Sequence, residues 1–185
     1  MAQRLETERL VLRPWTGDDA EAALRAYGDA EVARWLAPAM DQVGDQAAMR
    51  VVLQQWIAED ERMLTPAGRW AVESRRDGRL IGGATLLPRP PDDEYEIGWQ
   101  LQRDAWGHGY APEGAAAAMD WAFDNLGWET IIHSIAPDNL ASQAVARKLG
   151  SSLLGPGRLP EPYHEKPIEL WGQTREQWRK RRAGS

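Results

Sequence analysis

The stretch RDAWGHGYAPEGAAAAMDWAFDNLG, Arg103 to Gly127, places two glycines around a histidine immediately before a long alanine-rich run. Glycine permits backbone angles that other residues avoid, and it lets another group approach the main chain closely. The run from about Pro112 predicts a helix, with proline in its first turn and a glycine stop at Gly127. The N-terminus of a helix has amide N–H groups without partners inside the helix, so it can bind an anion, most often a phosphate. A tight strand-to-helix turn without a ligand is the alternative.

The residues just before this loop predict a strand. YEIGWQL, residues 95–101, alternates in a way that places apolar side chains on one face and polar side chains on the other. The apolar face consists of Tyr95, Ile97, Trp99 and Leu101, and the other face consists of Glu96, Gly98 and Gln100. Gly98 inside the strand indicates a bulge or a close backbone neighbour.

The rest of the chain predicts strands and helices in mixed order. The other expected strands are Arg9–Trp15, the pair RWAVES and RLIGGATLLP around a hairpin turn at Asp77-Gly78, ETIIHSIA, residues 151–154 and PIELWG. The other expected helices are one opened by a Thr16/Asp19 capping box and ending near Tyr27, then Glu31–Leu36, about Gln46–Arg62, and LASQAVARKLG. This order indicates an α/β or α+β fold with one mixed sheet.

Composition narrows the class of protein. A chain of 185 residues with 43% hydrophobic content can bury one core, so we expect one domain, over residues 1–173. The net charge of -6 argues against a general nucleic-acid binder, because neutralising phosphates requires a basic face. Residues 174–185 are basic and are expected to form a helix end or a solvated, frayed tail, with a contact to RNA or membrane as the alternative.

Several chemistries are excluded by what the chain lacks. It has no cysteine, so it has no disulfide, no thiolate metal site and no cysteine nucleophile. The N-terminal sequence has no apolar core typical of a secretory signal, and no run is long and apolar enough for a membrane span. We therefore expect a cytoplasmic location, no membrane partner and no metal site.

Two stretches taken together, YEIGWQLQRDAWGHGYAPEG and PDNLASQAVARKLG, resemble the GNAT superfamily of acyl-CoA-dependent N-acetyltransferases. Within it they are most similar to the branch of ribosomal-protein N-terminal alanine acetyltransferases, and the resemblance runs from LETERLVLRPW to IELWGQTREQW. It implies a GNAT fold of the α/β class, with a mixed, twisted sheet of about seven strands and about four flanking helices. Two central strands would splay apart in a V, with coenzyme A in the gap.

The resemblance also implies where the coenzyme binds. The family's pyrophosphate loop reads Gln/Arg-x-x-Gly-x-Gly/Ala; its last two fixed places fall on Gly109 and Ala111, and its first falls on Trp106, which departs from the superfamily pattern. Backbone amides of residues 106–111 would hold the pyrophosphate, and residues 99–101 would pair with the pantetheine as an added strand. Asn139 and Ser142 match the family's asparagine and serine near the thiol, with a helix cap alone as the alternative for Asn139. The expected coenzyme-binding set is Trp99, Gln100, Leu101, Arg103, Trp106, Gly107, His108, Gly109, Tyr110, Ala111, Asn139 and Ser142.

The reaction implied is transfer of an acetyl group from acetyl-CoA to a primary amine by direct attack in a ternary complex. Many relatives use a tyrosine seven places after the asparagine as the acid for the departing thiolate, and that place here is Ala146. We expect Ser142 as the replacement acid, with Ser134 as the second choice. Glu96 is the candidate base, with an exposed salt-bridge partner as the alternative, and a structural role is favoured for His133.

The sequence leaves the acceptor open between a protein N-terminus and a small-molecule amine. An α-amine with a pKa of about 7.7–8 requires a weaker base than a lysine amine near 10.4. This mildly favours an N-terminal amine or another amine of low pKa as the acceptor. The resemblance implies that residues 35–43 and 156–167 lie beside the acceptor and give specificity. Asp41, Glu161 and Glu165 in these segments indicate a cationic acceptor, with scattered surface charge as the alternative. A monomer or homodimer is expected. A non-catalytic acyl-CoA sensor or scaffold with the same fold is the alternative function, because of Ala146 and the uncertain base.

Overall fold

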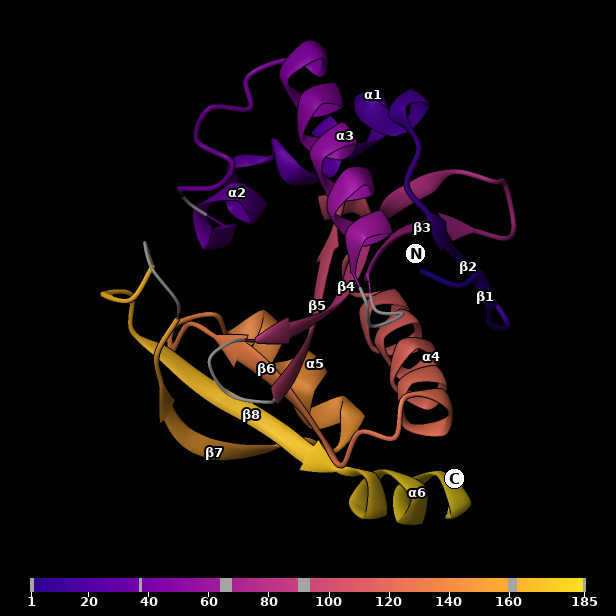
Figure 1. Ribbon diagram of the computed structural model, residues 1–185, viewed down its shortest axis with the longest axis vertical. Helices are drawn as coiled ribbons and strands as arrows, with labels where there is room; N and C mark the ends of the chain where they lie inside the picture. Colours follow the sequence, from indigo (N-terminus) through magenta and orange to yellow (C-terminus); the bar gives the residue numbers. More distant parts are fainter. Residues whose placement is uncertain (1, 37, 64–67, 90–93, 160–162, 185) are drawn as a thin grey trace.

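A computed structural model describes residues 2–36, 38–63, 68–89, 94–159 and 163–184. These residues form one open mixed sheet of eight strands, in the order β1-β2-β3-β4-β5-β6-β8-β7, flanked by six α-helices (Figure 1). The expected α/β class with a mixed sheet is confirmed. The strand count exceeds the expected seven partly because β1 (Leu5–Glu6) has only two residues, too few for an alternating pattern to reveal.

The first five strands form an antiparallel half of the sheet. They are β1, β2 (Leu10–Pro14), β3 (Gly68–Ser74), β4 (Leu80–Arg89) and β5 (Glu94–Leu101). The helices α1 (Ala20–Tyr27) and α3 (Gln46–Arg62) cover one face of this half, and α4 (Tyr110–Asn125) covers the other. Trp70 and Ala71 of β3 accordingly belong to separate cores, because successive residues of a strand point to opposite faces.

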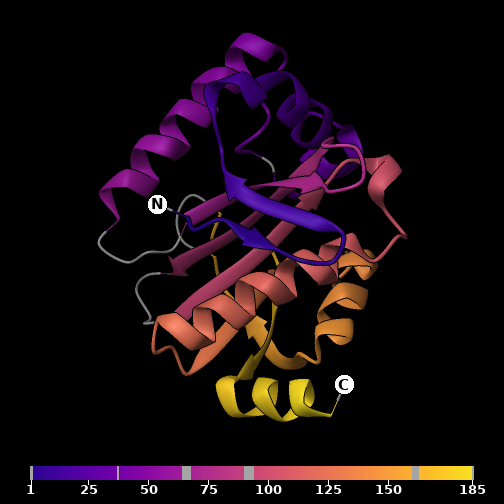
Figure 2. The same ribbon diagram turned by 90° about the vertical axis from the view of Figure 1, so that its right-hand side faces the viewer.

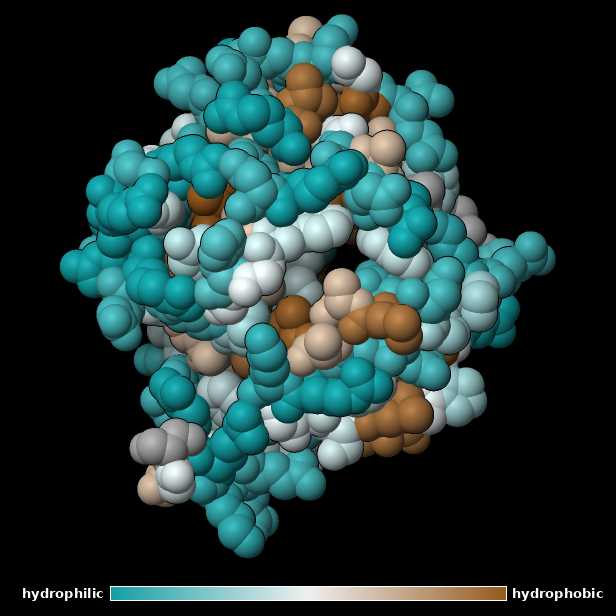
Figure 3. Space-filling view, turned by 180° about the vertical axis from the view of Figure 1, so that it is seen from behind, coloured by the Kyte–Doolittle hydropathy of each residue, from teal (hydrophilic) through white to brown (hydrophobic). Residues whose placement is uncertain are grey.

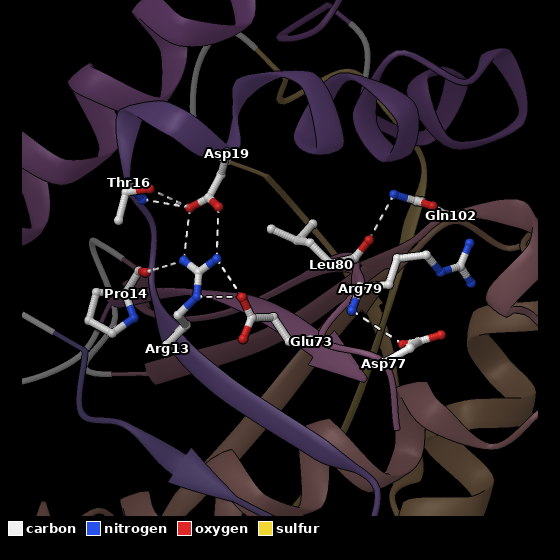
Figure 4. A network of polar contacts seen from close by, with 9 residues as sticks. All are labelled: Arg13, Pro14, Thr16, Asp19, Glu73, Asp77, Arg79, Leu80 and Gln102. Atoms are coloured by element: carbon white, nitrogen blue, oxygen red, sulfur yellow. Dashed lines mark hydrogen bonds and ion pairs between the residues drawn. The ribbon is translucent and has the colours of Figure 1, made fainter. Parts of the chain in front are cut away.

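The link between β2 and α1 is held by Arg13. Its guanidinium donates to both carboxylate oxygens of Asp19, at 2.8 and 2.7 Å, and to Glu73 at 2.7 Å (Figure 4). Asp19 also accepts from the Thr16 amide, so the expected capping box is present, with a short 3-10 turn, Gly17–Asp19, before α1. Burial raises the pKa of Asp19, but the hydrogen bonds from Arg13 and Thr16 outweigh it and lower the pKa.

The sheet opens between β5 and β6 (Thr130–Ile135). These parallel strands pair at Glu96 and Ile132 alone among the described residues, whereas β6 pairs along its whole length with β8 (Ile168–Thr174). Beyond Glu96, β5 and β6 therefore diverge. The β4–β5 register is continuous through Thr85 and Gly98, so the expected bulge at Gly98 is wrong. The close neighbours of Gly98 are side-chain atoms of Thr85 and Gln100, and not the backbone neighbour expected as the alternative.

The remaining helices enclose the open part of the sheet. The helix α2 (Ala30–Leu36) follows α1, and α5 (Leu140–Leu149) joins β6 to the edge strand β7 (Ser152–Gly157). The helix α4 begins two residues earlier than the expected Pro112, because Gly109 in the left-handed conformation is its N-cap. No helix of the described residues combines the length and apolar character that crossing a bilayer requires.

The basic C-terminal segment is a helix packed on the domain. Helix α6 (Arg175–Ala183) starts at a capping box of Thr174 and Gln177 and lies next to α4 (Figure 2). Trp178 is 3% exposed, and its indole N–H donates to Asp120 of α4 at 2.8 Å. Residues 175–183 therefore form a helix, one of the two expected alternatives, and not a frayed tail. Arg179, Lys180, Arg181 and Arg182 are exposed, whereas Arg175 is half-buried and donates to the Trp128 carbonyl.

Candidate active site

A cleft of about 650 Å³ lies where β5 and β6 diverge. Its walls come from β4, β5, β6, the loop before α4, α5 and α2. Figure 3 shows a hollow in the middle of the face that is seen from behind. Coenzyme-site candidates that line the cleft are Trp99, Gln100, Leu101, Trp106, Gly107, Gly109, Tyr110, Ala111, Asn139 and Ser142.

The loop before α4 presents a row of backbone amides. Gly107 and Gly109 have φ of +77° and +80°, in the left-handed region that only glycine enters at little cost. The Trp106 amide donates to the Arg103 carbonyl, so it is not one of the free amides of the loop, although Trp106 itself lines the cleft. The amides of residues 107–111 have no partner among the described residues, so they form a cradle suited to an anion.

Arg9 and Glu113 hold this loop. The Arg9 guanidinium donates to Glu113 at 2.6 Å and to the His108 carbonyl at 2.9 Å. Burial raises the pKa of Glu113, but hydrogen bonds from Thr7 and Arg9 outweigh it, and the pKa is lowered. Glu113 is thus a structural anion. Nothing in the local sequence identified Arg9, which lies 99 residues before His108.

Two expected coenzyme residues do not reach the cleft. Arg103 donates to Asp29 at 2.7 Å, a bond that lowers the pKa of Asp29, and it is not among the lining residues. His108 contributes its carbonyl to Arg9, and its side chain also lies outside the lining. The cationic side chains that line the cleft in the described chain are Arg34, Lys148 and Lys166.

The open edge of β5 offers backbone groups to the cleft. The Ile97 carbonyl faces β6 and interacts with His133 Nδ1 at 3.2 Å, and the Leu101 carbonyl accepts from the Trp106 indole at 2.8 Å. Because backbone groups alternate sides along a strand, Trp99 N–H, Trp99 C=O and Leu101 N–H also face this side. Gln100 pairs through its backbone with Gly83 of β4 instead. Of the expected 99–101 segment, Trp99 and Leu101 thus supply the backbone groups, and Gln100 supplies only its side chain.

His133 is a satisfied, buried residue. It is 1% exposed, and its second ring nitrogen lies 2.8 Å from the Ser151 hydroxyl. Burial lowers the pKa of His133 to about 4, so the ring is neutral near pH 7. Because the Ile97 carbonyl can only accept, Nδ1 carries the proton and Nε2 accepts from Ser151. The favoured structural role of His133 agrees with this environment.

The start of α5 places a serine at the cleft. Asn139 accepts from the Ser142 amide at 3.1 Å, so Asn139 does cap the helix while it also lines the cleft. The Ser142 hydroxyl is half-exposed and makes no hydrogen bond with the described residues. Ala146 is fully buried, packs with Ile135 and Trp171, and does not line the cleft.

The structure brings two other candidates together. The Ser134 hydroxyl donates to the Glu96 carboxylate at 2.9 Å, across the point where β5 and β6 separate. Arg89 Nε lies 3.7 Å from the same carboxylate. Glu96 therefore lines the cleft and forms the ion pair that was expected as the alternative, and its role as a base stays a prediction.

Within the described chain, only parts of the two expected specificity segments line the cleft. Trp35 and Leu36 of α2 line it together with Leu159 and Lys166, so parts of both expected specificity segments are present. Asp41 and Glu165 do not line it, and Glu161 lies outside the described residues. Asp41 and Glu165 therefore give no support to the expectation that acidic residues attract a cationic acceptor to the cleft. The described residues also contain no group of three or more histidine and carboxylate side chains arranged to hold a metal ion.

Fold and cleft together define an open-sheet acyltransferase, and comparison with known proteins gives the family. Residues 9–152 match the family described as "Acetyltransferase (GNAT) domain", so the chain belongs to the GNAT acetyltransferases. It is 30% identical over 148 residues to the uncharacterized N-acetyltransferase YoaA of Bacillus subtilis, a match that covers 79% of this chain and 81% of the relative. FsC-acetyl coenzyme A-N(2)-transacetylase of Aspergillus fumigatus is 27% identical over 186 residues, covering 94% of this chain and 77% of the relative.

Among solved structures, the ribosomal-protein-S5-alanine acetyltransferase from Vibrio fischeri has the same fold. The TM-score is 0.75 at 19% identity, with 95% of this chain and 98% of that chain covered. The GNAT resemblance is thus confirmed, and the chain is an acetyltransferase. The sequence relatives do not establish the ribosomal-protein branch.

Proposed function

We propose that this protein is an acetyl-CoA-dependent N-acetyltransferase that acetylates a primary amine, on a protein N-terminus or on a small molecule, by direct attack in a ternary complex. The observation that carries the proposal is the meeting of three features in one cleft. These are the free amides of residues 107–111, the Trp99 backbone and Leu101 N–H on the open edge of β5, and the side chains of Ser142 and Glu96.

The fit to coenzyme A follows from the chemistry of these groups. The amides of residues 107–111 and the N-terminus of α4 suit a pyrophosphate, because both present positive dipole ends to an anion. Trp99 and Leu101 suit the two amides of a pantetheine arm, which would lie against β5 like an added strand. Asn139 and Ser142 close the other side of the same cleft.

Acetyl-CoA supplies an activated acetyl group as a thioester, and the protein has to position both reactants and move protons. Holding the two reactants in one cleft can lower the barrier by about 7–11 kcal/mol in favourable geometry. Glu96 is the group we assign to take the proton that the amine loses. We assign Ser142 to give a proton to the departing thiolate, with Ser134 as second choice, because its hydroxyl proton is engaged by Glu96. The products are then an N-acetylated amine and free coenzyme A.

The test is release of free thiol from acetyl-CoA in the presence of a panel of amines, with the acetylated product identified by mass spectrometry. We expect release that depends on the amine. Tight binding of acetyl-CoA without release across peptides, amino acid derivatives and polyamines would support the sensor or scaffold instead. Assembly as a monomer or homodimer and a cytoplasmic location stay predictions.

A further inference from the structure

A polar recess lies in the cleft, on the face of β4 and β5 on which α1 packs. Thr85 faces Gly98 across these two strands, and Gly83 faces Gln100 in the next pair. Thr85, Gly98 and Gln100 line the cleft, and we call these three residues the Gly98 recess. Glu96 is two residues from Gly98 on the same strand, so its side chain points to the same face.

The side chain of Gln100 is held in place from behind. The Tyr27 hydroxyl donates to Gln100 Oε1 at 3.3 Å. Tyr27 is 2% exposed and is fixed between the rings of Trp15 and Trp56, with centroids 6.1 and 5.2 Å away. Gly83 permits this arrangement, because a Cβ at that position would collide with the Tyr27 hydroxyl. The bond to Oε1 leaves the amide Nε2 of Gln100 to face Gly98.

The recess exists because residue 98 has no side chain. A Cβ at Gly98 would lie 2.8 Å from Thr85 Oγ1 and 3.5 Å from Gln100 Nε2, so even alanine would fill the space. Neither Thr85 Oγ1 nor Gln100 Nε2 makes a hydrogen bond with the described residues. Two hydrogen-bond donors therefore converge on a space of about one atom beside the candidate base, in a cleft that the apolar side chains of Val32, Trp35 and Leu36 also line.

We propose that the Gly98 recess is the specificity element for the acceptor: it binds a carbonyl or hydroxyl oxygen carried next to the reacting amine. The inference rests on the proposed function and extends it to the class of acceptor. Gln100 Nε2 can only donate, and it selects an oxygen rather than an ammonium group. An amine without such an oxygen leaves the two donors without a partner inside the cleft, which costs binding.

The test compares amines in pairs, one with a carbonyl or hydroxyl oxygen next to the amine and one without it. The probes are L-alaninamide with isopropylamine, and ethanolamine with propylamine, at saturating acetyl-CoA. The measured quantity is the ratio of kcat/KM within each pair, for the wild type and for Thr85→Val, which removes the hydroxyl at nearly constant shape. Comparing this ratio between variants cancels the different pKa values of the amines. Thr130→Val, at the start of β6 and outside the cleft, is the matched control.

We expect Thr85→Val to lower the ratio about tenfold, Thr85→Ser to restore most of it, and Thr130→Val to leave it unchanged. Gly98→Ala should lower kcat/KM for every amine while the Kd of acetyl-CoA, measured by calorimetry, stays within twofold. An unchanged ratio in Thr85→Val, or an equal loss for both members of a pair, would overturn the recess as a specificity element. A wild type that releases no thiol with any amine would overturn the proposed function itself, and the recess proposal with it.

Discussion

Gly107→Ala tests whether the left-handed backbone conformation of the glycine loop is required to bind the coenzyme. Gly107 has φ of +77°, and a Cβ at that position would meet no atom within 4 Å. The cost of the substitution is therefore backbone strain alone, about 1–2 kcal/mol for a residue other than glycine in the left-handed region. We expect the loop of the free variant to relax, so that regaining this shape on binding raises the Kd of acetyl-CoA about 5- to 30-fold.

Gly127→Ala is the matched control for this strain. Gly127 also has a left-handed φ, +69°, and a Cβ there would likewise meet no atom within 4 Å, but this glycine follows α4 and does not line the cleft. We expect this variant to lose about 2–8 °C in Tm, the shift for a similar strain in a domain of this size, with the Kd unchanged.

The assays are calorimetric titration with acetyl-CoA and thermal unfolding of both variants. The expected pattern is a raised Kd for Gly107→Ala alone. A Kd that is unchanged in Gly107→Ala, or raised equally in Gly127→Ala, would refute the placement of the pyrophosphate on this loop.

Three further outcomes are expected. Ser142→Ala should lower kcat about 100-fold or more if the hydroxyl is the acid, with little change in the Kd of acetyl-CoA; equal turnover in steady-state assays removes Ser142 from the chemistry. The pKa of His133 is about 4 in the folded protein and near 6.5 when unfolded, so the unfolded chain binds the proton first as pH falls. The contribution of neutral His133 to stability is complete above pH 6.5 and is lost between pH 6.5 and 4. Over this pH range the urea midpoint of His133→Gln should fall less than that of the wild type. An equal fall in both proteins would contradict a buried, neutral ring. Trp178→Ala should cost about 3–5 kcal/mol of unfolding free energy while acetyl-CoA still binds, and a Tm equal to that of the wild type would show that α6 does not support the domain.

Local patterns predict the elements well where backbone preferences decide them. Helix α3 has the expected bounds, Gln46–Arg62, because Asp45 caps its start and apolar residues recur along it. The expected start of α4 is too late, because proline suits any place in a first helical turn, whereas the left-handed Gly109 already caps the helix. Strand β1 has too few residues to produce a pattern, so the sequence does not predict it.

The sequence predicted only part of the candidate site. The family motifs indicated the residues that line the cleft along β5, the glycine loop and α5, which are contiguous stretches. They did not indicate that Arg103 turns to Asp29, that Ser134 donates to Glu96, or that Tyr27 holds Gln100. Each of these contacts joins segments far apart in the chain, and sequence spacing does not encode them.

The order of amino acids is enough to specify where the chain bends and which stretches form helices and strands, because φ preferences and side-chain periodicity act between near neighbours. It is also enough to specify the family, through two motifs made of such stretches. Three features arise only when the chain is folded: β5 separates from β6 beyond Glu96, Arg9 holds a loop 99 residues away, and the missing side chain of Gly98 opens a recess beside Thr85. These features depend on which strands become neighbours, and that is set by burial of the two cores on opposite faces of the sheet.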